Sequence, residues 1–175
     1  GGTITNGEPV VTDMVPAEGV TEESLLALAA SLEKRSEHPL AKAILKYVGE
    51  QQLTVEDVSE FEALPGNGLT AVRNGVKLAG GNYAFIRTQT EVSEDLLKQS
   101  EVLAEQGKTP MFFAENGRLA GIIAVADTMK EDSRQAVSEL RNMGIRVVML
   151  TGDNERTARA IGAQAGVDDV IAGVL

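Results

Sequence analysis

The chain has 175 residues, of which 43% are hydrophobic and 24% are charged, values typical of a globular protein with one domain or two small ones. Its formal net charge of −10 argues against binding to nucleic acid or to an anionic membrane surface, because both require clustered Lys or Arg. Cysteine is absent and histidine occurs once, which argues against disulfides and a structural zinc site. An anionic ligand would have to be held by backbone N–H groups, helix N-termini and Mg2+.

Two amphipathic helices are predicted first. Thr21 is a suitable N-cap for a helix that extends to about Arg35, and Pro39 suits the first turn of a second helix. Their apolar residues recur at helical spacing, at Leu25, Leu28 and Leu32 in the first and at Leu40, Ile44 and Val48 in the second.

Two hairpins and a third helix follow. Asn74-Gly75 and Asn116-Gly117 each lie between apolar runs, which is the strongest short-range signal for a hairpin. Between the hairpins, Ser93 is a suitable cap for a helix that Gly107 ends. Residues 13–126 are therefore predicted to form an α+β domain, with helices flanking an antiparallel sheet.

The pattern changes near Asp127. A capping box over 128–131 predicts a helix, and 145–150 is a β-branched run suited to a buried parallel strand. A further helix over about 155–165 and a strand within 167–172 complete an αβαβ pattern, typical of a doubly wound, Rossmann-like sheet.

Thr151, Gly152 and Asp153 follow that predicted parallel strand directly. Ligands bind at the carboxyl ends of such strands, where glycine admits a phosphate, Thr can donate to it and Asp can hold Mg2+. An ordinary turn has the same composition, and spacing alone does not separate the two interpretations.

Two glycine-rich segments, 65–68 and 80–82, are further candidates. Closely spaced glycines let a flat ligand or a phosphate approach the backbone. Taken singly, each segment is better explained as a bulged loop.

The segment SEHPL, residues 36–40, contains the single histidine. His38 could stack against a heterocycle at a turn stiffened by Pro39, and Glu33 on the preceding helix could reach the same pocket. The alternative is that His38 only caps the helix and Glu33 is a surface carboxylate.

The motifs SEHPL, PGNGL, GGN, ADTMKEDS and MLTGDNERTA occur in this order, and together they resemble the cytoplasmic ATP-binding region of a heavy-metal-transporting P-type ATPase, the copper exporters above all. The resemblance covers nearly the whole chain. It implies the start of a phosphorylation domain at 1–12, a nucleotide-binding domain at 13–126 and part of a haloacid-dehalogenase-like phosphorylation domain at 127–175.

The resemblance also implies roles for particular residues, with ATP and Mg2+ as ligands. Asp127 resembles the aspartate at the hinge between the two domains. Three residues resemble those that stabilise the phosphoryl group and Mg2+: Thr151, Gly152 and Asp153. Seven residues resemble the nucleotide contacts: Glu33 and His38 at adenine, and Gly66, Gly68, Leu69, Gly81 and Asn82 near the base, sugar and phosphates.

The family's phosphorylated aspartate lies in an Asp-Lys-Thr-Gly-Thr motif, which the 175 residues do not contain. We therefore expect a monomeric fragment that binds ATP or ADP without turning ATP over and has no metal site of its own. Its partners would be the transmembrane and actuator domains of the parent pump, with the fragment on the cytoplasmic side.

Two alternatives remain open. One is a soluble phosphatase or hydrolase of the haloacid dehalogenase class, although no DxD-type motif precedes the first helix, because Asp13 is followed by Met14 and Val15. The other is a non-catalytic module that senses nucleotides.

Overall fold

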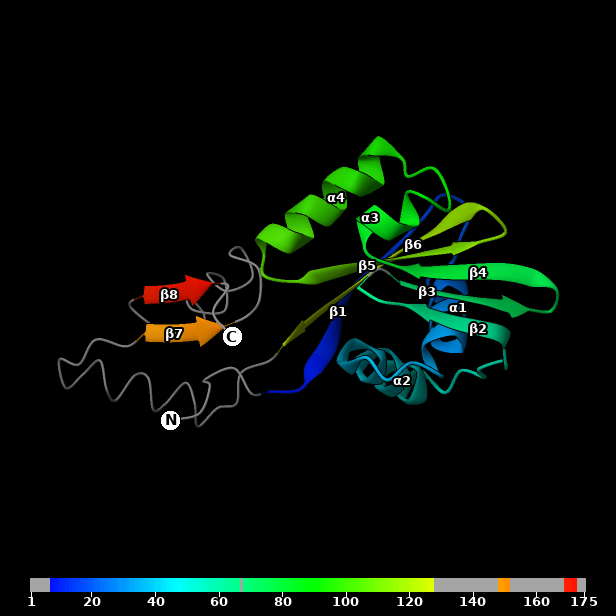
Figure 1. Cartoon of the computed structure of the whole chain (residues 1–175), viewed down its shortest axis with the longest axis horizontal. Coiled ribbons are helices and arrows are strands. Elements are labelled where there is room, and N and C mark those ends of the chain that lie inside the picture. Colours follow the sequence, from blue (N-terminus) through cyan, green and yellow to red (C-terminus); the bar gives the residue numbers. More distant parts are fainter. Residues whose placement is uncertain (1–6, 67, 128–147, 152–168, 173–175) are drawn as a thin grey trace.

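The computed structural model describes residues 7–66, 68–127, 148–151 and 169–172, which form two sheets (Figure 1). The first sheet has the strand order β1-β6-β5-β4-β3-β2, and all neighbouring strands in it are antiparallel. Its strands are β1 (Pro9–Pro16), β2 (Ser59–Leu64), β3 (Gly68–Arg73), β4 (Val76–Gly81), β5 (Thr109–Glu115) and β6 (Arg118–Asp127). The antiparallel sheet predicted for 13–126 is therefore confirmed.

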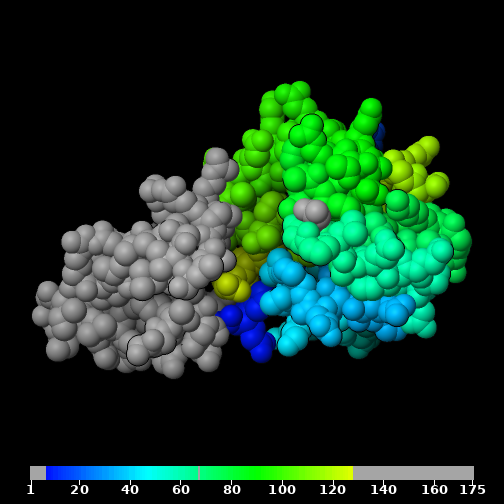
Figure 2. Space-filling view, in the orientation of Figure 1, coloured from blue at the N-terminus to red at the C-terminus, as the bar shows by residue number. Residues whose placement is uncertain are grey.

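Helices cover both faces of this sheet. They are α1 (Glu22–Glu33), α2 (Pro39–Gln51), α3 (Tyr83–Ile86) and α4 (Glu94–Glu105). The pair α1 and α2 lies on one face, and α3 and α4 lie on the other (Figure 1); the same division is visible on the surface as the blue-cyan and green parts of Figure 2. The predicted caps are confirmed, because Thr21 accepts a hydrogen bond from the N–H of Ser24 and Ser93 accepts one from the N–H of Leu96.

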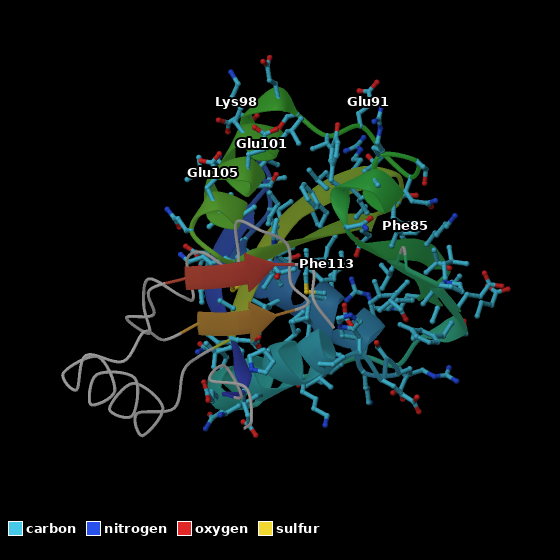
Figure 3. The ribbon with its side chains drawn as sticks, turned by 60° about the vertical axis from the view of Figure 1, so that its left-hand side comes forward. Phe85, Glu91, Lys98, Glu101, Glu105 and Phe113 are labelled. Carbon is cyan, nitrogen blue, oxygen red and sulfur yellow. The ribbon has the colours of Figure 1, made fainter. Side chains whose placement is uncertain are left out.

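Each face of the sheet has its own apolar core, since successive side chains of a strand point to opposite faces. Phe113 and Ile123 pack with the α1 and α2 side, whereas their neighbours Phe112 and Ile122 pack with the α3 and α4 side. All four side chains are buried. Figure 3 shows Phe113 within the sheet, while Glu101 and Glu105 project outward from α4. The sheet is therefore the middle layer of three.

Both hairpin turns have the backbone conformation that their sequences require. Asn74 and Gly75 have φ values of 52° and 77°, and Asn116 and Gly117 have values of 53° and 73°. Two successive residues with positive φ form a type I′ turn, whose twist matches that of the flanking strands. The turns fix the register, so that Arg73 pairs with Val76 and Glu115 pairs with Arg118.

The sequence-based prediction missed both edge strands and α3. The residues of β1 pair with β6 from Pro9↔Asp127 to Pro16↔Gly121, so β1 runs continuously across the predicted boundary between residues 12 and 13. A bulge between Val11 and Asp13 disturbs its alternation. The other edge strand, β2, is mostly exposed, and Glu60 within it has a φ of 51°. Edge strands of this kind lack the periodic apolar signal on which the prediction relied.

The second sheet consists of β7 (Val148–Thr151) and β8 (Asp169–Ala172), which are parallel. A parallel pair in this part of the chain agrees with the αβαβ pattern. The predicted helices over 128–144 and 155–165 lie outside the described residues. Within the described ranges, no helix is both long enough and apolar enough to span a membrane.

Candidate functional site

The SEHPL segment forms the connection between α1 and α2. Pro39 is the first residue of α2, where its fixed φ and missing N–H fit the helix, and His38 is the N-cap. The imidazole Nδ1 of His38 accepts a hydrogen bond from the N–H of Leu40 at 3.1 Å. With Nδ1 as the acceptor, the neutral ring carries its proton on Nε2. His38 is exposed, so this Nε2–H donor is accessible from solvent.

Glu33 is the last residue of α1 and is only 2% exposed. Its Oε2 is buried and has no hydrogen-bond partner among the described residues. Burial raises the pKa of this carboxyl to about 7, and a side-chain hydrogen bond with Ser36 offsets part of that shift. Glu33 is therefore not the surface carboxylate of the simpler interpretation, and near neutral pH it is a mixture of acid and carboxylate.

Ser36 connects the two predicted contact residues, and no role was predicted for it. Its backbone N–H donates to the carbonyl oxygen of Glu33 at 2.9 Å, and its Oγ accepts from the N–H of His38 at 3.1 Å. The same side chain forms the hydrogen bond with the Glu33 carboxyl. The available signal was its place in SEHPL, because a short hydroxyl between two helices commonly bonds nearby backbone groups.

The two glycine-rich segments meet at one end of the sheet. Gly68 pairs with Gly81 across β3 and β4, and Leu69 pairs with Gly80. A Cβ added to Gly68 would collide with the ring of Phe85, a residue of α3 that is labelled in Figure 3, and would lie 2.5 Å from the carbonyl oxygen of Gly80. Gly68 is therefore required by packing, whatever else it does.

Gly66 and Asn82 could contact a ligand in different ways, Gly66 through its backbone and Asn82 through its side chain. Gly66 is exposed, has a φ of +70°, and a Cβ at this position would meet no atom within 4 Å, so its backbone is open to a ligand. The side-chain oxygen of Asn82 accepts a hydrogen bond from the N–H of Phe85 at 2.9 Å and caps α3. Its carboxamide NH2 remains as a donor.

The C-terminal end of α1 lies against this end of the sheet. A Cβ on Gly80 would lie 2.7 Å from Cδ2 of Leu32, the residue before Glu33. Just beyond the helix, the guanidinium carbon of Arg35 is 5.6 Å from the centroid of the Phe61 ring on β2. The end of α1 therefore lies against β4 at Gly80, and the following loop lies against β2 at Phe61. We call Glu33, Ser36, His38, Gly66 and Gly81 the loop site.

The other predicted site is only partly described. Thr151 is the last residue of β7 and pairs with Ala172 of β8, in agreement with its predicted place at the end of a parallel strand. Gly152 and Asp153 lie outside the described residues. Asp127 is the last residue of β6 and pairs with Pro9.

A hollow of about 390 Å³ lies at the opposite end of α1. Its lining combines side chains of β1, α1 and α2 with Leu53: Met14, Glu22, Glu23, Leu26, Tyr47, Gln51 and Leu53. None of the residues predicted to bind a ligand belongs to this lining.

The loop site has the chemistry of binding. It offers a buried carboxyl, an exposed imidazole and an open glycine backbone, which suit a polar planar ligand. Within the described ranges, no three His, Cys, Asp or Glu side chains form a group that could hold a metal ion.

Comparison with known sequences identifies a family. The model of the haloacid dehalogenase-like hydrolases matches residues 1–175. The chain is 46% identical over 177 residues to the copper-exporting P-type ATPase of Staphylococcus saprophyticus and 42% identical over 174 residues to that of Bacillus subtilis. In both cases the match covers 99% of this chain and 21% of the relative, so the chain spans about a fifth of the length of these relatives.

Comparison with solved structures agrees. A zinc-transporting PIB-type ATPase in its E2.Pi state superposes with a TM-score of 0.84 at 35% identity, covering 99% of this chain and 28% of that one. The N-domain of a copper-transporting P-type ATPase superposes with a TM-score of 0.57 at 26% identity, covering 68% of this chain and 99% of that domain. The second match links the six-stranded sheet and its helices to an N-domain.

Proposed function

The chain belongs to the haloacid dehalogenase-like hydrolase family, and we propose that within this family it is the ATP-binding region of a heavy-metal-exporting P-type ATPase. The exported ion is proposed to be copper, in keeping with the names of its relatives. The parent pump would work through an aspartyl phosphate. In that setting the described domain supplies nucleotide binding.

One observation carries this proposal: Glu33 is buried with a free carboxyl oxygen immediately beside the SEHPL segment. A buried polar group without a partner lowers stability by about 1–3 kcal/mol. Such a group is most readily explained by a ligand that completes its hydrogen bonding. The glycine segments at the adjacent end of the sheet give a nucleotide room along the backbone.

The proposed contacts divide into base and backbone contacts. Glu33 and His38 would contact adenine, with Ser36 holding the two residues in register. The remaining contacts would be made near the sugar and phosphates, by the backbone of Gly66, Gly68, Leu69 and Gly81 and by the carboxamide of Asn82. The net charge of −10 repels phosphates at long range, so the phosphates would have to be held by local hydrogen-bond donors such as these neutral groups.

The C-terminal part would belong to a Rossmann-like phosphorylation domain. Residues 1–12 and 127–175 are proposed to form part of it, with Asp127 at the hinge to the nucleotide-binding domain of residues 13–126. Thr151, Gly152 and Asp153 would stabilise the phosphoryl group and Mg2+, since a Thr hydroxyl donates to phosphate oxygens and an Asp carboxylate binds Mg2+. Transmembrane and actuator domains would complete the pump, with this region on the cytoplasmic side.

Calorimetric titration of ATP tests the binding proposal. In the His38→Asn variant, Asn still caps α2 but the imidazole is lost, so we expect unchanged thermal stability and ATP binding weakened about tenfold, the effect of one lost polar contact of about 1.4 kcal/mol. Lys46→Gln, on the exposed surface of α2, is the matched control and should bind as the wild type does. Equal ATP affinity in the His38→Asn variant and the wild type would reject the contact.

Incubation with radiolabelled ATP tests the second part of the proposal. Since the 175 residues contain no Asp-Lys-Thr-Gly-Thr motif, we expect ATP to bind without forming an acid-stable phosphoenzyme. A labelled phosphoenzyme from this chain alone would show that another aspartate serves as the nucleophile.

A further inference from the structure

The environment of the Glu33 carboxyl favours its neutral form. The side chain is 2% exposed. Among the described residues, Ser36 is the only one whose side-chain hydrogen bond lowers the pKa of Glu33. Oε2 has no partner among the described residues. A carboxylate in this position would be a buried charge without a counter-ion, which is far less favourable than the acid.

Among the described residues, no cation lowers the pKa of Glu33. The helix packs against α2, β1, β3, β4, β5 and β6. The titratable and charged residues of these elements are Lys42, Lys46, Tyr47, Glu50, Asp13, Arg73, Lys77, Glu115, Arg118 and Asp127, to which the loop adds Lys34, Arg35, Glu37 and His38. Burial and the Ser36 hydrogen bond account for the pKa of Glu33, and none of these residues contributes to it.

Several of these groups interact elsewhere. Lys34 Nζ lies 2.7 Å from Asp57 Oδ1, and the Arg35 guanidinium lies over the ring of Phe61. Arg73 bonds Glu115 on β5. The cations nearest to Glu33 along the chain are therefore directed toward β2 and the segment before it.

The protonation state of a carboxyl determines which base it can pair with. A neutral carboxylic acid presents one donor and one acceptor side by side, and this pattern matches N1 and the N6 amino group of adenine. A carboxylate presents two acceptors, which match the N1–H and N2 amino group of guanine instead. The neutral acid therefore favours adenine, and ionisation removes that preference.

We propose that Glu33 recognises the base as the neutral carboxylic acid, donating from Oε2 to N1 and accepting from N6, and so selects adenine over guanine. The inference rests on the proposed nucleotide-binding function and deepens it. Oε2 is buried, so contact with the base requires neighbouring side chains to move aside. Ser36 positions the carboxyl, because its side chain hydrogen-bonds both the Glu33 carboxyl and the backbone N–H of His38.

Calorimetric titration with ATP and with GTP, at pH 6 and pH 8 and at one fixed Mg2+ concentration, tests this assignment. With a pKa of about 7, about nine-tenths of the Glu33 carboxyls are protonated at pH 6 and about one-tenth at pH 8, so the apparent ATP affinity of the wild type should fall about tenfold. Its preference for ATP over GTP should narrow over the same range.

Glu33→Gln is the informative variant, because its amide is always one donor and one acceptor. We expect this variant to keep the wild-type ATP affinity of pH 6 at both pH values. Since the two proteins differ only at residue 33 and bind the same ligand, the difference between their pH profiles isolates the contribution of Glu33. Glu37→Gln, in the same loop but exposed, should keep the wild-type profile.

The outcomes separate the inference from the function on which it rests. Parallel pH profiles in the wild type and the Glu33→Gln variant, with ATP still bound, would overturn the inference alone. A loss of ATP binding in the Glu33→Gln variant at both pH values would do the same, since a carboxylate would then be required. If the wild type bound ATP at neither pH, the proposed function would fail and the inference with it.

A direct readout is the ¹³C chemical shift of the Glu33 carboxyl in the ATP complex. We expect the shift of a protonated carboxyl at pH 7.5. The shift of a carboxylate in the saturated complex would overturn the assignment.

Discussion

The two ends of α1 place the same type of residue in opposite environments. At the first turn, Glu22 and Glu23 are exposed beside the hollow and follow the N-cap Thr21. At the last turn, Glu33 is buried, and one of its oxygens lacks a partner among the described residues. Carboxylates at a helix N-terminus are stabilising, and at a C-terminus they are not. The first pair therefore stabilises the helix, whereas the burial of Glu33 has no such explanation in the fold, in keeping with the ligand contact proposed for it.

The hollow lies at the N-terminal end of α1, whereas the proposed nucleotide contacts lie at the other end. Its glutamates are solvated and act on the helix dipole, so their presence needs no ligand. The loop site differs in having a carboxyl, that of Glu33, whose pKa is raised by burial. A carboxyl with a perturbed pKa is a more informative sign of function than a pair of solvated glutamates.

The largest effect should come from removing the charge at the C-terminal end. The folded pKa of Glu33, about 7, lies above the ordinary glutamate value of 4.5, so the folded state retains a proton that the unfolded state releases. Wild-type stability should therefore decline as pH rises from about 4.5 to 7 and remain level above that. Relative to the Glu33→Gln variant, we expect a loss of about 2.5 kcal/mol between pH 5 and pH 8, measured by urea denaturation.

A stability difference between the wild type and the Glu33→Gln variant that does not change with pH would contradict this expectation, because the pKa of Glu33 would then be the same in the folded and unfolded states. Glu37→Gln is the control for general pH effects, since Glu37 is exposed in the adjacent loop.

The second-largest effect on stability should come from Gly80, against which Leu32 packs at the C-terminal end of α1. A Cβ on Gly80 would lie 2.7 Å from Leu32 Cδ2 and 2.8 Å from Phe113 Cδ1, and both side chains are fully buried. Gly80→Ala should destabilise the domain by about 2 kcal/mol. Gly49→Ala in α2, where a Cβ meets no atom within 4 Å, should instead stabilise it by about 0.5 kcal/mol. Thermal denaturation of both variants measures the pair, and equal effects would contradict this packing.

The cap at the N-terminal end should matter less. Thr21 Oγ1 accepts a hydrogen bond from the N–H of Ser24 at 3.0 Å, and Thr21→Ala should lower stability by about 1 kcal/mol. Thr21→Ser keeps the hydroxyl and should stay close to the wild type. ATP affinity should be unchanged in both variants. An altered affinity would show that the two ends of α1 are not independent.

The smallest effect should come from an exposed glutamate of the first turn. Glu23→Gln removes a favourable interaction with the helix dipole and should lower stability by about 0.3 kcal/mol at pH 8, a change visible in urea denaturation only with replicate curves. The sign is opposite to that expected for Glu33→Gln at the same pH. If both substitutions changed stability in the same direction at pH 8, the two ends of α1 would not differ as described.

Local patterns in the sequence predicted much of this fold. The caps Thr21 and Ser93 and the two Asn-Gly turns act through neighbouring backbone groups, so short segments contain the information. The strands β1 and β2 were missed, because they are edge strands with bulges, and their pairing depends on residues far away in the chain. The pairing of Pro9 with Asp127 is not encoded in either local segment.

For the candidate site, too, the sequence predicted the features that depend on neighbouring residues and missed those that depend on packing. His38 and Pro39 follow from a local helix start, and the cap was one of the alternatives considered. The burial of Glu33 depends on how α1 lies against β4, which no spacing in the sequence reveals. Gly68 and Asn82 were predicted as ligand contacts, and the structure gives each a structural role as well, against Phe85 and at the start of α3. Their ligand contacts stay predictions.

The most direct test of the account is an NMR titration of the ¹⁵N-labelled chain with ATP, because it reports on both ends of α1 at once. We predict that the amide signals of Glu33, Ser36, His38, Gly66 and Gly81 shift with a common dissociation constant. Signals of the hollow, at Glu22, Glu23, Tyr47 and Gln51, should stay in place. Shifts confined to the hollow, with the loop site unmoved, would contradict the central claim that nucleotide binds at the C-terminal end of α1.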